Sequence, residues 1–529
     1  MDLLENLKKN QPIRALVKPV YDATFRKVIN SYLYWIFRNE KNRRKPENPV
    51  EMAAFFVEKN GFLLFDGGRN VEPSLSKLLG TYPEVEWFIF IETDAVLSGR
   101  TETALQRAIA RQPACDLLYM DVDRLTESVH RTDPWFKPDF NFFAFRTENL
   151  LRPFCAVRRG LLERIAGKTT LAGKFNWAEM TFRLAESASQ IVHIPEIGAH
   201  YAPGWRADDP ERLALENDAI RAHLRRKQID ADVLPLRSAP FRRIRYRSSR
   251  TPLVSILIPN KDQREMLSRA LTSIRTKTTY PNYEILVIEN NSVTPEIEAY
   301  YRELEADESF PGRILRYADR FNYSKINNFG AERANGEIFV FLNNDTEILS
   351  PGWLDELVSL AERDEVGAVG AKLLFPNRSI QHAGCSYGSF KERWMFHVFE
   401  GSPESATVYR NGTRKLTPVL AVTGACLVMK RSLFEEIGGF PTDLPVVYND
   451  IELCWMAYER GKTNLYTPYA RLIHYESATR GADMSPEQIA SVRANFRTLT
   501  SRHQAIAANP DPFYSVNLRF DQYFMEKIQ

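Results

Sequence analysis

The sequence contains little cysteine and no long apolar run. Its five cysteines are scattered and form no C-x-x-C pair: Cys115, Cys155, Cys385, Cys426 and Cys454. This pattern is typical of a reducing compartment, and it argues against a disulfide scaffold or a structural zinc site. No uninterrupted apolar run approaches ~18 residues, so the sequence predicts no helix that spans a bilayer.

A strong net charge and a secretion signal are also missing. The formal net charge is +3 over 529 residues, which gives no general reason to expect nucleic acid as a partner. Residues 1–5 (MDLLE) show no charged-then-apolar signal pattern. We therefore expect a cytoplasmic protein, either free or peripheral on the inner face of the cell membrane. The length predicts two or three domains.

Three blocks of sequence occur twice in the same order. The corresponding ranges are 88–94 (FIFIETD) with 339–345 (FVFLNND), 155–165 with 426–437, and 177–201 with 450–475. The copies are displaced by about 250 to 275 residues, which indicates a duplicated domain rather than a solenoid.

The two copies differ where chemistry would be expected. The second copy has Asp450 where the first has Trp177. An indole can neither accept a proton nor bind a metal ion, so the second copy is the candidate catalyst and the first is degenerate. Asp94 and His200 persist in the first copy.

We interpret the first copy as a non-catalytic module that orients an acceptor or supports the second copy. The alternative is a second active site, in which Glu179 or Asp123 would take the role of the base.

Four segments are predicted: a basic, aromatic-rich lead segment (1–50), the degenerate copy (51–236), an Arg-rich linker (237–251), and the second copy with a C-terminal extension (252–529). The lead segment is either an interfacial helix on anionic lipid or a helix packed on the first domain with a solvated basic tail. The linker is either solvated or anion-binding, and we favour the solvated form.

The second copy alternates apolar strands with helices. Residues 254–259 (VSILIP), 284–288 and 338–342 are predicted as buried strands, with helices over 264–276 and 324–334. This order predicts a doubly wound α/β fold, which binds ligands at the carboxyl ends of its strands. The first strand is not followed by G-x-G-x-x-G, so a dinucleotide site is not predicted.

Polar motifs follow these strands: 287–292 (VIENNS), 343–347 (NNDTE), 449–450 (ND) and 474–477 (HYES). With the opening strand, they resemble family 2 glycosyltransferases of GT-A fold. Three further blocks are similar to the bacterial rhamnosyltransferase-type branch: 322–330, 380–384 and 423–426. The resemblance implies a duplicated GT-A sheet, with a degenerate first copy.

The resemblance also implies roles for individual residues. Asp450 is expected as the catalytic base, and Asp345 and His474 as ligands of Mn²⁺ or Mg²⁺. The nucleotide-sugar donor is expected to contact Pro259, Asn260, Glu289, Asn291, Asn328, Asn343, Asn344, Thr423 and Gly424. Glu289 stands where the family usually has Asp, and Asn343 replaces the first carboxylate of D-x-D, so metal affinity is expected to be modest.

The chemistry of these residue types is consistent with sugar transfer. One carboxylate, one imidazole and diphosphate oxygens suit Mn²⁺ or Mg²⁺ better than zinc. A free Asp has a pKa of about 3.9 and is a weak base. It becomes effective when it is held in hydrogen-bond reach of the attacking hydroxyl. Direct in-line attack then inverts the anomeric centre.

Each of these residues also has a structural interpretation. Asp345 could be an ordinary strand-end turn residue, and His474 a core histidine. Asp450 could cap a helix over 451–460 that Gly461 ends. Glu452 would be turned away from Asp450 by the helix and is expected to be structural.

Two further histidines, His382 and His397, are not expected to take part in catalysis. His382 and His397 lack a partner at metal-ligand spacing in the sequence, so we expect them to be structural or to lie on the acceptor side.

The expected function is therefore an inverting, metal-dependent glycosyltransferase. The donor would be a dTDP- or UDP-sugar, with rhamnose as the first candidate. The acceptor would be a saccharide or lipid-linked saccharide of a growing surface polysaccharide or glycolipid. The alternatives are transfer of glucose, galactose or N-acetylglucosamine, or a carbohydrate-binding pseudoenzyme.

Overall fold

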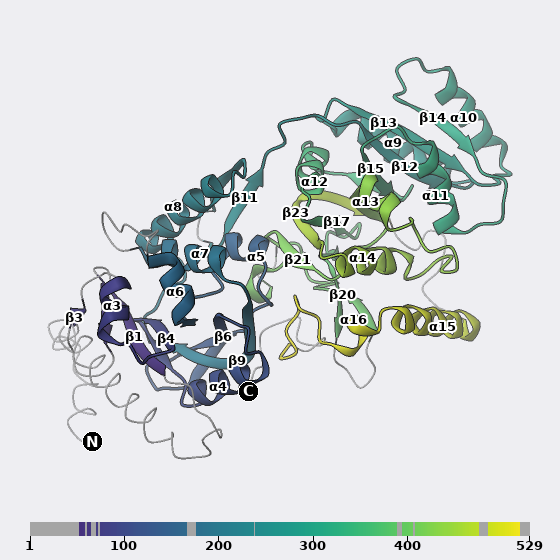
Figure 1. Cartoon of the computed structure of the whole chain (residues 1–529). Coiled ribbons are helices and arrows are strands. Elements are labelled where there is room, and N and C mark those ends of the chain that lie inside the picture. Colours follow the sequence, from purple (N-terminus) through teal and green to yellow (C-terminus); the bar gives the residue numbers. More distant parts are fainter. Residues whose placement is uncertain are drawn as a thin grey trace. The chain divides into compact units, whose positions relative to one another are not determined.

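The computed structural model describes residues 52–58, 61–64, 70–71, 75–166, 176–236, 239–388, 394–405, 408–475 and 485–518. The predicted lead segment lies outside these residues. The chain divides into unit 1 (residues up to 140 and 149–219) and unit 2 (141–148 and 220 onward) (Figure 1). Among the described helices, none combines the length and the apolar composition needed to cross a membrane.

The described elements of unit 1 are β1 (Met52–Glu58), β2 (Gly61–Leu64), β3 (Asn70–Val71), α3 (Leu75–Thr81), β4 (Trp87–Glu92), β5 (Ala95–Leu97), α4 (Thr101–Arg111), β6 (Leu117–Leu125), β7 (Arg131–Trp135), β8 (Phe154–Arg158), α6 (Arg159–Ala166), α7 (Trp177–Ser187) and β9 (Ile191–Tyr201). Helix α8 (Pro210–Arg226) then continues from unit 1 into unit 2.

The first half of unit 2 contains α5 (Phe142–Thr147), β10 (Ala231–Pro235), β11 (Arg242–Tyr246), β12 (Val254–Asn260), α9 (Arg264–Lys277), β13 (Tyr283–Glu289), α10 (Pro295–Ala306), β14 (Gly312–Arg316), α11 (Tyr323–Arg333), β15 (Ile338–Leu342), β16 (Thr346–Ile348) and α12 (Trp353–Ala361).

The second half contains β17 (Val366–Leu374), β18 (Ile380–His382), β19 (Cys385–Gly388), β20 (Trp394–His397), η2 (Tyr409–Asn411), β21 (Thr417–Val419), β22 (Cys426–Lys430), α13 (Arg431–Glu436), α14 (Asn449–Glu459), β23 (Thr463–His474), α15 (Pro486–Arg502) and α16 (Gln504–Ala508).

The central strands of unit 2 are apolar along almost their whole length because helices cover the sheet. Strand β15 is buried at every position, and β12 at all but one. Helix α11 meets the sheet at Gly330, where an added Cβ would lie 2.4 Å from Ile288 Cδ1 and 2.8 Å from Leu257 Cδ2. A side chain at this position would push α11 away, so glycine sets the close distance between helix and sheet.

The two units contain the same strand arrangement. In unit 1 the order β1-β4-β8-β6-β9-β5 has one parallel, two antiparallel, one parallel and one antiparallel pairing. In unit 2 the order β12-β15-β22-β17-β23-β16 repeats this series. The α/β fold class is therefore confirmed. The common topology supports duplication, which stays a hypothesis.

The predicted Arg-rich linker contains a strand. Within 237–251, β11 pairs antiparallel with β10. Asp232 accepts hydrogen bonds from Arg245 and Arg247, each with a closest N–O distance of 2.6 Å, and Arg243 lies 3.0 Å from Glu356. Arg245 and Arg247 stay about half exposed, with side-chain exposures of 50% and 54%, so the segment is solvated but ordered by strand pairing and carboxylates. The ion pairs also leave these three side chains poorly suited to binding another anion.

Helix α5 lies inside the sequence of unit 1 but belongs to unit 2. Asn141 caps it by accepting the Phe143 N–H at 2.8 Å, and its amide donates to Thr463 Oγ1 at 3.0 Å. At the other end, Glu148 pairs with Arg410 and lies 2.8 Å from Lys415 Nζ. Unit 2 is thus assembled from two separate stretches of chain.

Candidate active site

Three parallel strands of unit 2 end beside one another. Strand β12 pairs in parallel with both β13 and β15, and Asn260 stands opposite Glu289 in this register. Asn344, two residues beyond β15, donates from its amide to Asn260 Oδ1 at 2.6 Å. The predicted donor-binding residues of three sequence motifs are therefore brought to one edge of the sheet.

Glu289 is buried in a network of hydrogen bonds. Its Oε1 accepts the Ser292 N–H at 2.7 Å, and its Oε2 accepts from Tyr301 at 3.1 Å and from the Ser292 hydroxyl. Asn260 donates to the same Tyr301 hydroxyl at 2.7 Å. The contact between Glu289 and a nucleotide base stays a prediction, and the structure adds that this carboxylate holds the turn after β13.

Asp345 and His474 lie together although 129 positions separate them. Strand β16 pairs with β23 so that Thr346 stands opposite His474, and the Tyr475 N–H donates to the Asp345 carbonyl at 2.9 Å. His474 Nε2 is 3.1 Å from Asp345 Oδ1. Both side chains are mostly buried, with exposed fractions of 9% and 17%.

The neighbours of His474 determine which of its nitrogens carries the proton. Nδ1 lies 2.8 Å from Gln381 Oε1, which can only accept, so Nδ1 is the protonated nitrogen of the neutral ring. The lone pair of Nε2 then faces Asp345 Oδ1, a buried oxygen with no hydrogen-bond partner among the described residues. Either a proton on Nε2, which makes an ion pair with Asp345, or a divalent metal ion removes the repulsion between the two acceptors. The pair can therefore hold a divalent metal ion.

Asp450 occupies the first turn of α14 and is half-buried. Its Oδ2 accepts the Gly424 N–H at 2.7 Å, and its Oδ1 accepts the Ile451 N–H at 2.9 Å. Burial raises the pKa of Asp450 above its ordinary value, although these hydrogen bonds act in the opposite direction. A raised pKa makes Asp450 a stronger base than a carboxylate in water.

The capping alternative for Asp450 is wrong in its details. Helix α14 begins at Asn449, and the capping residue is Tyr448, which has a left-handed φ of 67°. The helix ends at Glu459, and Gly461 follows with a φ of 74°. Asp450 is thus inside the first turn. Glu452 is 2.8 Å from Arg502 and is structural, as predicted.

The loop between β21 and β22 connects Asp450 to the Asp345 turn. The Asn343 N–H donates to the Ala425 carbonyl at 3.1 Å, and Tyr323 donates to the Gly424 carbonyl at 2.9 Å. Burial raises the pKa of Tyr323, and the charges of Asp450 and Asp345 raise it further. The base candidate Asp450 and the turn that carries Asp345 are therefore both bonded to this loop.

The other predicted donor-binding residues make contacts of several kinds. The amide nitrogen of Asn328 donates to the Phe440 carbonyl, and its amide oxygen accepts the Phe440 N–H, each at 2.9 Å. Asn328 therefore holds the loop that contains Phe440. Asn291 has a φ of 55° and donates to the carbonyls of Ala318 and Asp319. Thr423 Oγ1 lies 3.4 Å from the Ala425 nitrogen. Donor contacts of these three residues stay predictions.

Pro259 and Asn343 lie where the site was expected. Pro259 is the penultimate residue of β12 and stands opposite Ile288. Asn343 Nδ2 is 3.3 Å from His474 Nε2 and can donate to the free lone pair. A carboxylate at this position would add negative charge beside Asp345, whereas the amide does not.

Two residues of the site were not assigned roles from the sequence. Gln381 orients His474, and Tyr323 holds the loop beside Asp450. Each lies in a motif that resembles the rhamnosyltransferase-type branch. That was the available signal, but their contacts span 93 and 101 positions.

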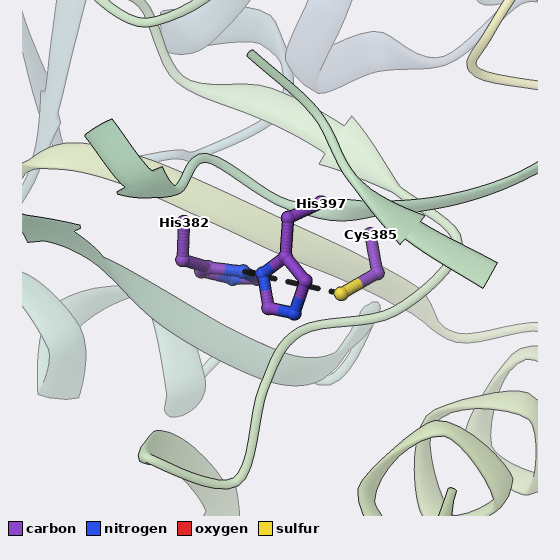
Figure 2. Close-up of side chains that lie close together, drawn as sticks. All are labelled: His382, Cys385 and His397. Atoms are coloured by element: carbon purple, nitrogen blue, oxygen red, sulfur yellow. Dashed lines mark hydrogen bonds between the residues drawn. The ribbon is translucent and has the colours of Figure 1, made fainter. Parts of the chain in front are cut away.

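His382 and His397 lie beside a possible third metal ligand. The two imidazoles are hydrogen-bonded at 3.0 Å between their Nδ1 atoms, and Cys385 lies beside them (Figure 2). Pairing of β19 with β20 brings Cys385 opposite His397. The sequence did not group these residues because the contact depends on this strand pairing, and the expected structural or acceptor-side role of the two histidines stays a prediction.

The register of unit 1 corrects the expected match of His200 with His474. Ala95 stands opposite Tyr201, and the Ala202 N–H donates to the Asp94 carbonyl at 2.8 Å. Tyr201 therefore occupies the position of His474. A one-residue shift on a strand turns the side chain to the other face, and His200 instead bonds Asp123.

Unit 1 offers no second base at the expected positions. Trp177 is buried at the start of α7, with its ring centroid 5.9 Å from that of Phe90. Asp123 bonds His200 and lies 2.6 Å from Arg131, while Glu179 lies 2.8 Å from Arg183. Both carboxylates proposed as substitute bases are thus engaged in ion pairs.

Comparisons with known proteins match part of unit 2 to a family. Residues 255–438, which include Asp345, match the model of Glycosyl transferase family 2. The chain therefore contains a family 2 glycosyltransferase domain.

Individual relatives carry related names. The O-antigen biosynthesis protein RfbC of Myxococcus xanthus is 36% identical over 407 residues, which cover 75% of this chain and 31% of that protein. The N-acetylglucosaminyl-diphospho-decaprenol L-rhamnosyltransferase of Mycobacterium tuberculosis is 24% identical over 45% of this chain and 80% of its own length. The chain thus spans about a third of the length of the RfbC protein.

One solved structure with a similar arrangement is the mannosyltransferase PcManGT from Pyrobaculum calidifontis in complex with GDP-Man and Mn²⁺. It is 19% identical, covers 51% of this chain and 68% of its own chain, and has a TM-score of 0.36.

Proposed function

We propose that unit 2 is an inverting, metal-dependent glycosyltransferase. It would transfer a sugar, with rhamnose as the first candidate, from a dTDP- or UDP-sugar to a growing surface polysaccharide or glycolipid. The observation that carries the proposal is the close pair of Asp345 Oδ1 and His474 Nε2, 3.1 Å apart. The half-buried carboxylate of Asp450 is bonded to the same loop that bonds the Asp345 turn. The names of the O-antigen and rhamnosyltransferase relatives support the class.

Asp345 and His474 would hold Mn²⁺ or Mg²⁺. When bound, such an ion acts as a Lewis acid on the diphosphate leaving group. Gln381 would keep the His474 Nε2 lone pair directed at the site by accepting a hydrogen bond from Nδ1–H. Asn343 contributes no charge, so the diphosphate itself must supply part of the negative charge that attracts the ion.

Asp450 would accept the proton of the attacking hydroxyl. The Gly424 N–H and the α14 N-terminus fix one face of its carboxylate, and burial raises its pKa. A hydroxyl placed within hydrogen-bond reach loses its proton as the new bond to the anomeric carbon forms. Because the nucleoside diphosphate departs from the opposite side, the anomeric configuration is inverted.

The nucleotide would lie along the ends of β12 and β13. Asn260 and Asn344 form one hydrogen-bonded pair across the strands, and Glu289 carries acceptor oxygens at the end of β13. In unit 1, Tyr201 stands in place of His474, and Trp177 stands in place of Asp450. Unit 1 would therefore orient the acceptor or support unit 2. A lipid-linked acceptor would bring the protein to the inner face of the membrane.

Thermal unfolding with nucleotides tests the proposal. UDP, dTDP, GDP and CDP are each added with and without Mn²⁺, and Asp345→Asn is the matched variant. Ligand at 100 times its Kd stabilises by about 2.7 kcal/mol. We expect a Mn²⁺-dependent rise in Tm with UDP or dTDP that Asp345→Asn loses.

The absence of a shift with every nucleotide would contradict a working donor site. Turnover assays then separate the enzyme from the alternative. A carbohydrate-binding pseudoenzyme would bind saccharide without consuming dTDP-rhamnose, UDP-glucose, UDP-galactose or UDP-N-acetylglucosamine.

A further inference from the structure

We propose that His382, Cys385 and His397 form a second metal site, which holds one zinc-class divalent ion. The three ligand atoms all lie within 4.8 Å of one another. They come from β18, β19 and β20, and Figure 2 shows the two rings and the thiol converging on one point. This site is separate from the Asp345–His474 pair and does not depend on the proposed transferase reaction.

The spacing of the ligand atoms suits tetrahedral zinc. Zn–N bonds of about 2.0–2.1 Å and a Zn–S bond of about 2.3 Å place two nitrogens about 3.3 Å apart, and a nitrogen and a sulfur about 3.6 Å apart. Here the two Nδ1 atoms are 3.0 Å apart, and His382 Nδ1 is 3.9 Å from Cys385 Sγ. All three atoms lie within 4.8 Å of one another, so the side chains would move closer to form three bonds, which leaves one position for water.

The backbone arranges the ligands before any ion binds. His382 and Cys385 flank a turn at Gly384, which has a φ of 103°, and an added Cβ there would lie 2.5 Å from Val419 Cγ1. Glycine is therefore required for the turn that directs the thiol back toward His382. The third ligand, His397, is the cross-strand neighbour of Cys385.

His382 and Cys385 are both buried, so little water competes for their ligand atoms. An ion at the three ligand atoms would replace the single hydrogen bond between the two Nδ1 atoms with metal bonds.

Nitrogen and thiolate ligands select zinc over the ion of the first site. Two imidazoles and a sulfur form a softer set than the carboxylate and imidazole of Asp345 and His474. Gln381 and His382 are adjacent in β18: one orients His474 and the other binds the second ion. The zinc would thereby hold the strand that positions a ligand of the first metal.

Cobalt spectroscopy of the full chain tests this site. The protein is stripped with a chelator and titrated with Co²⁺, and Zn²⁺ binding is measured in competition with a chromophoric chelator. We expect one tightly bound ion and a thiolate-to-cobalt charge-transfer band. Cys385→Ser should lose the band and weaken zinc binding at least about 100-fold. Cys155→Ser, which removes a buried thiol of unit 1, should keep both.

Further variants keep the outcome decisive. Asp345→Asn should retain the band and the zinc, which distinguishes this site from the proposed donor site. If Cys385→Ser fails to fold, His397→Gln and the wild-type spectrum still report on the cluster. A Co²⁺-loaded wild type without a thiolate band, or Cys385→Ser with unchanged zinc affinity, would overturn the proposal and leave a hydrogen-bonded histidine pair.

Discussion

At the scale of single residues, the site depends on which atoms lie beside each polar group. His474 Nδ1 lies beside Gln381 Oε1, and its Nε2 lies 3.1 Å from Asp345 Oδ1. Asp450 is a half-buried carboxylate with two backbone donors. These neighbours decide what each group can do in a reaction.

Replacement of Asp450 by Asn tests the assignment of the base. We expect Asp450→Asn to lower transfer at least about 100-fold while nucleotide binding with Mn²⁺ is unchanged. Glu452→Gln, two positions along the same helix, removes a carboxylate paired with Arg502 and should leave the rate intact. Near-wild-type turnover by Asp450→Asn in a sugar-transfer assay would contradict the assignment.

The same variant has an expected pH signature in unfolding. The folded-state pKa of Asp450 is raised, so the wild type is most stable while this group is protonated and loses that contribution as pH rises above about 4. Asn does not titrate. The Tm of the variant relative to the wild type should therefore increase between pH 4 and pH 7.

At the scale of elements, short segments hold the site together across long stretches of chain. Strand β23 carries His474 to the Asp345 turn, and α5 ties residues 141–148 into unit 2. The register of β9 in unit 1 shows how sensitive such placement is. Tyr201 occupies the position in unit 1 that corresponds to His474 in unit 2, and a shift of one residue along the strand would place His200 there instead.

Glu148, at the end of α5, gives a pH-dependent prediction. Burial alone would raise its pKa, but Arg410 and Lys415 hold it at about 2. A lowered folded-state pKa stabilises above the unfolded value of about 4.3, and this contribution is lost as pH falls from about 4 toward 2. Glu148→Gln should therefore lower the free energy of unfolding by roughly 3 kcal/mol at pH 7.

Urea unfolding at several pH values measures this effect. The difference between Glu148→Gln and the wild type should shrink as pH falls below 4. Glu298→Gln offers an exposed ion-pair control, since Glu298 lies 2.8 Å from Arg316 at the surface, and it should cost less than about 1 kcal/mol. Equal costs at pH 7 and pH 3 for Glu148→Gln would contradict the ion-pair account.

At the scale of the whole molecule, the two units share one chain in an interleaved order. Helix α5 is inserted in the sequence of unit 1 but contributes Asn141, Arg146 and Glu148 to unit 2. Arg146 donates to Tyr246 at 3.2 Å and to His223 at 3.0 Å. A cut between the units in sequence therefore removes structure from unit 2.

A fragment of residues 220–529 is expected to be less stable than unit 2 in the full chain. It lacks every contact of α5, so its loss should exceed the roughly 3 kcal/mol expected for Glu148 alone. Urea unfolding of the fragment, and of the same fragment with residues 139–150 fused to it, measures the difference. The fusion should recover most of the stability, and an identical midpoint for both would contradict the role given to α5.

The sequence by itself determined the α/β class and the positions of the polar motifs. Continuous apolar runs such as 338–342 are buried strands wherever they lie, and the residues that follow them reach the sheet edge. Asp345, Asp450 and His474 could be named because each follows or begins such an element. The ordering of β11 and the zinc-class cluster could not, because both depend on strand pairings, of β10 with β11 and of β19 with β20, that the residue pattern did not indicate.

Only the tertiary structure decided how far apart the side chains of the site lie and on which face of its strand each one lies. Whether Nε2 of His474 meets Asp345, whether Tyr201 or His200 faces the equivalent site, and whether Cys385 joins His382 and His397 all depend on strand register. Side chains alternate between the two faces of a strand, so a shift of one residue reverses the answer. Such pairings join residues distant in sequence, and local patterns carry no information about them.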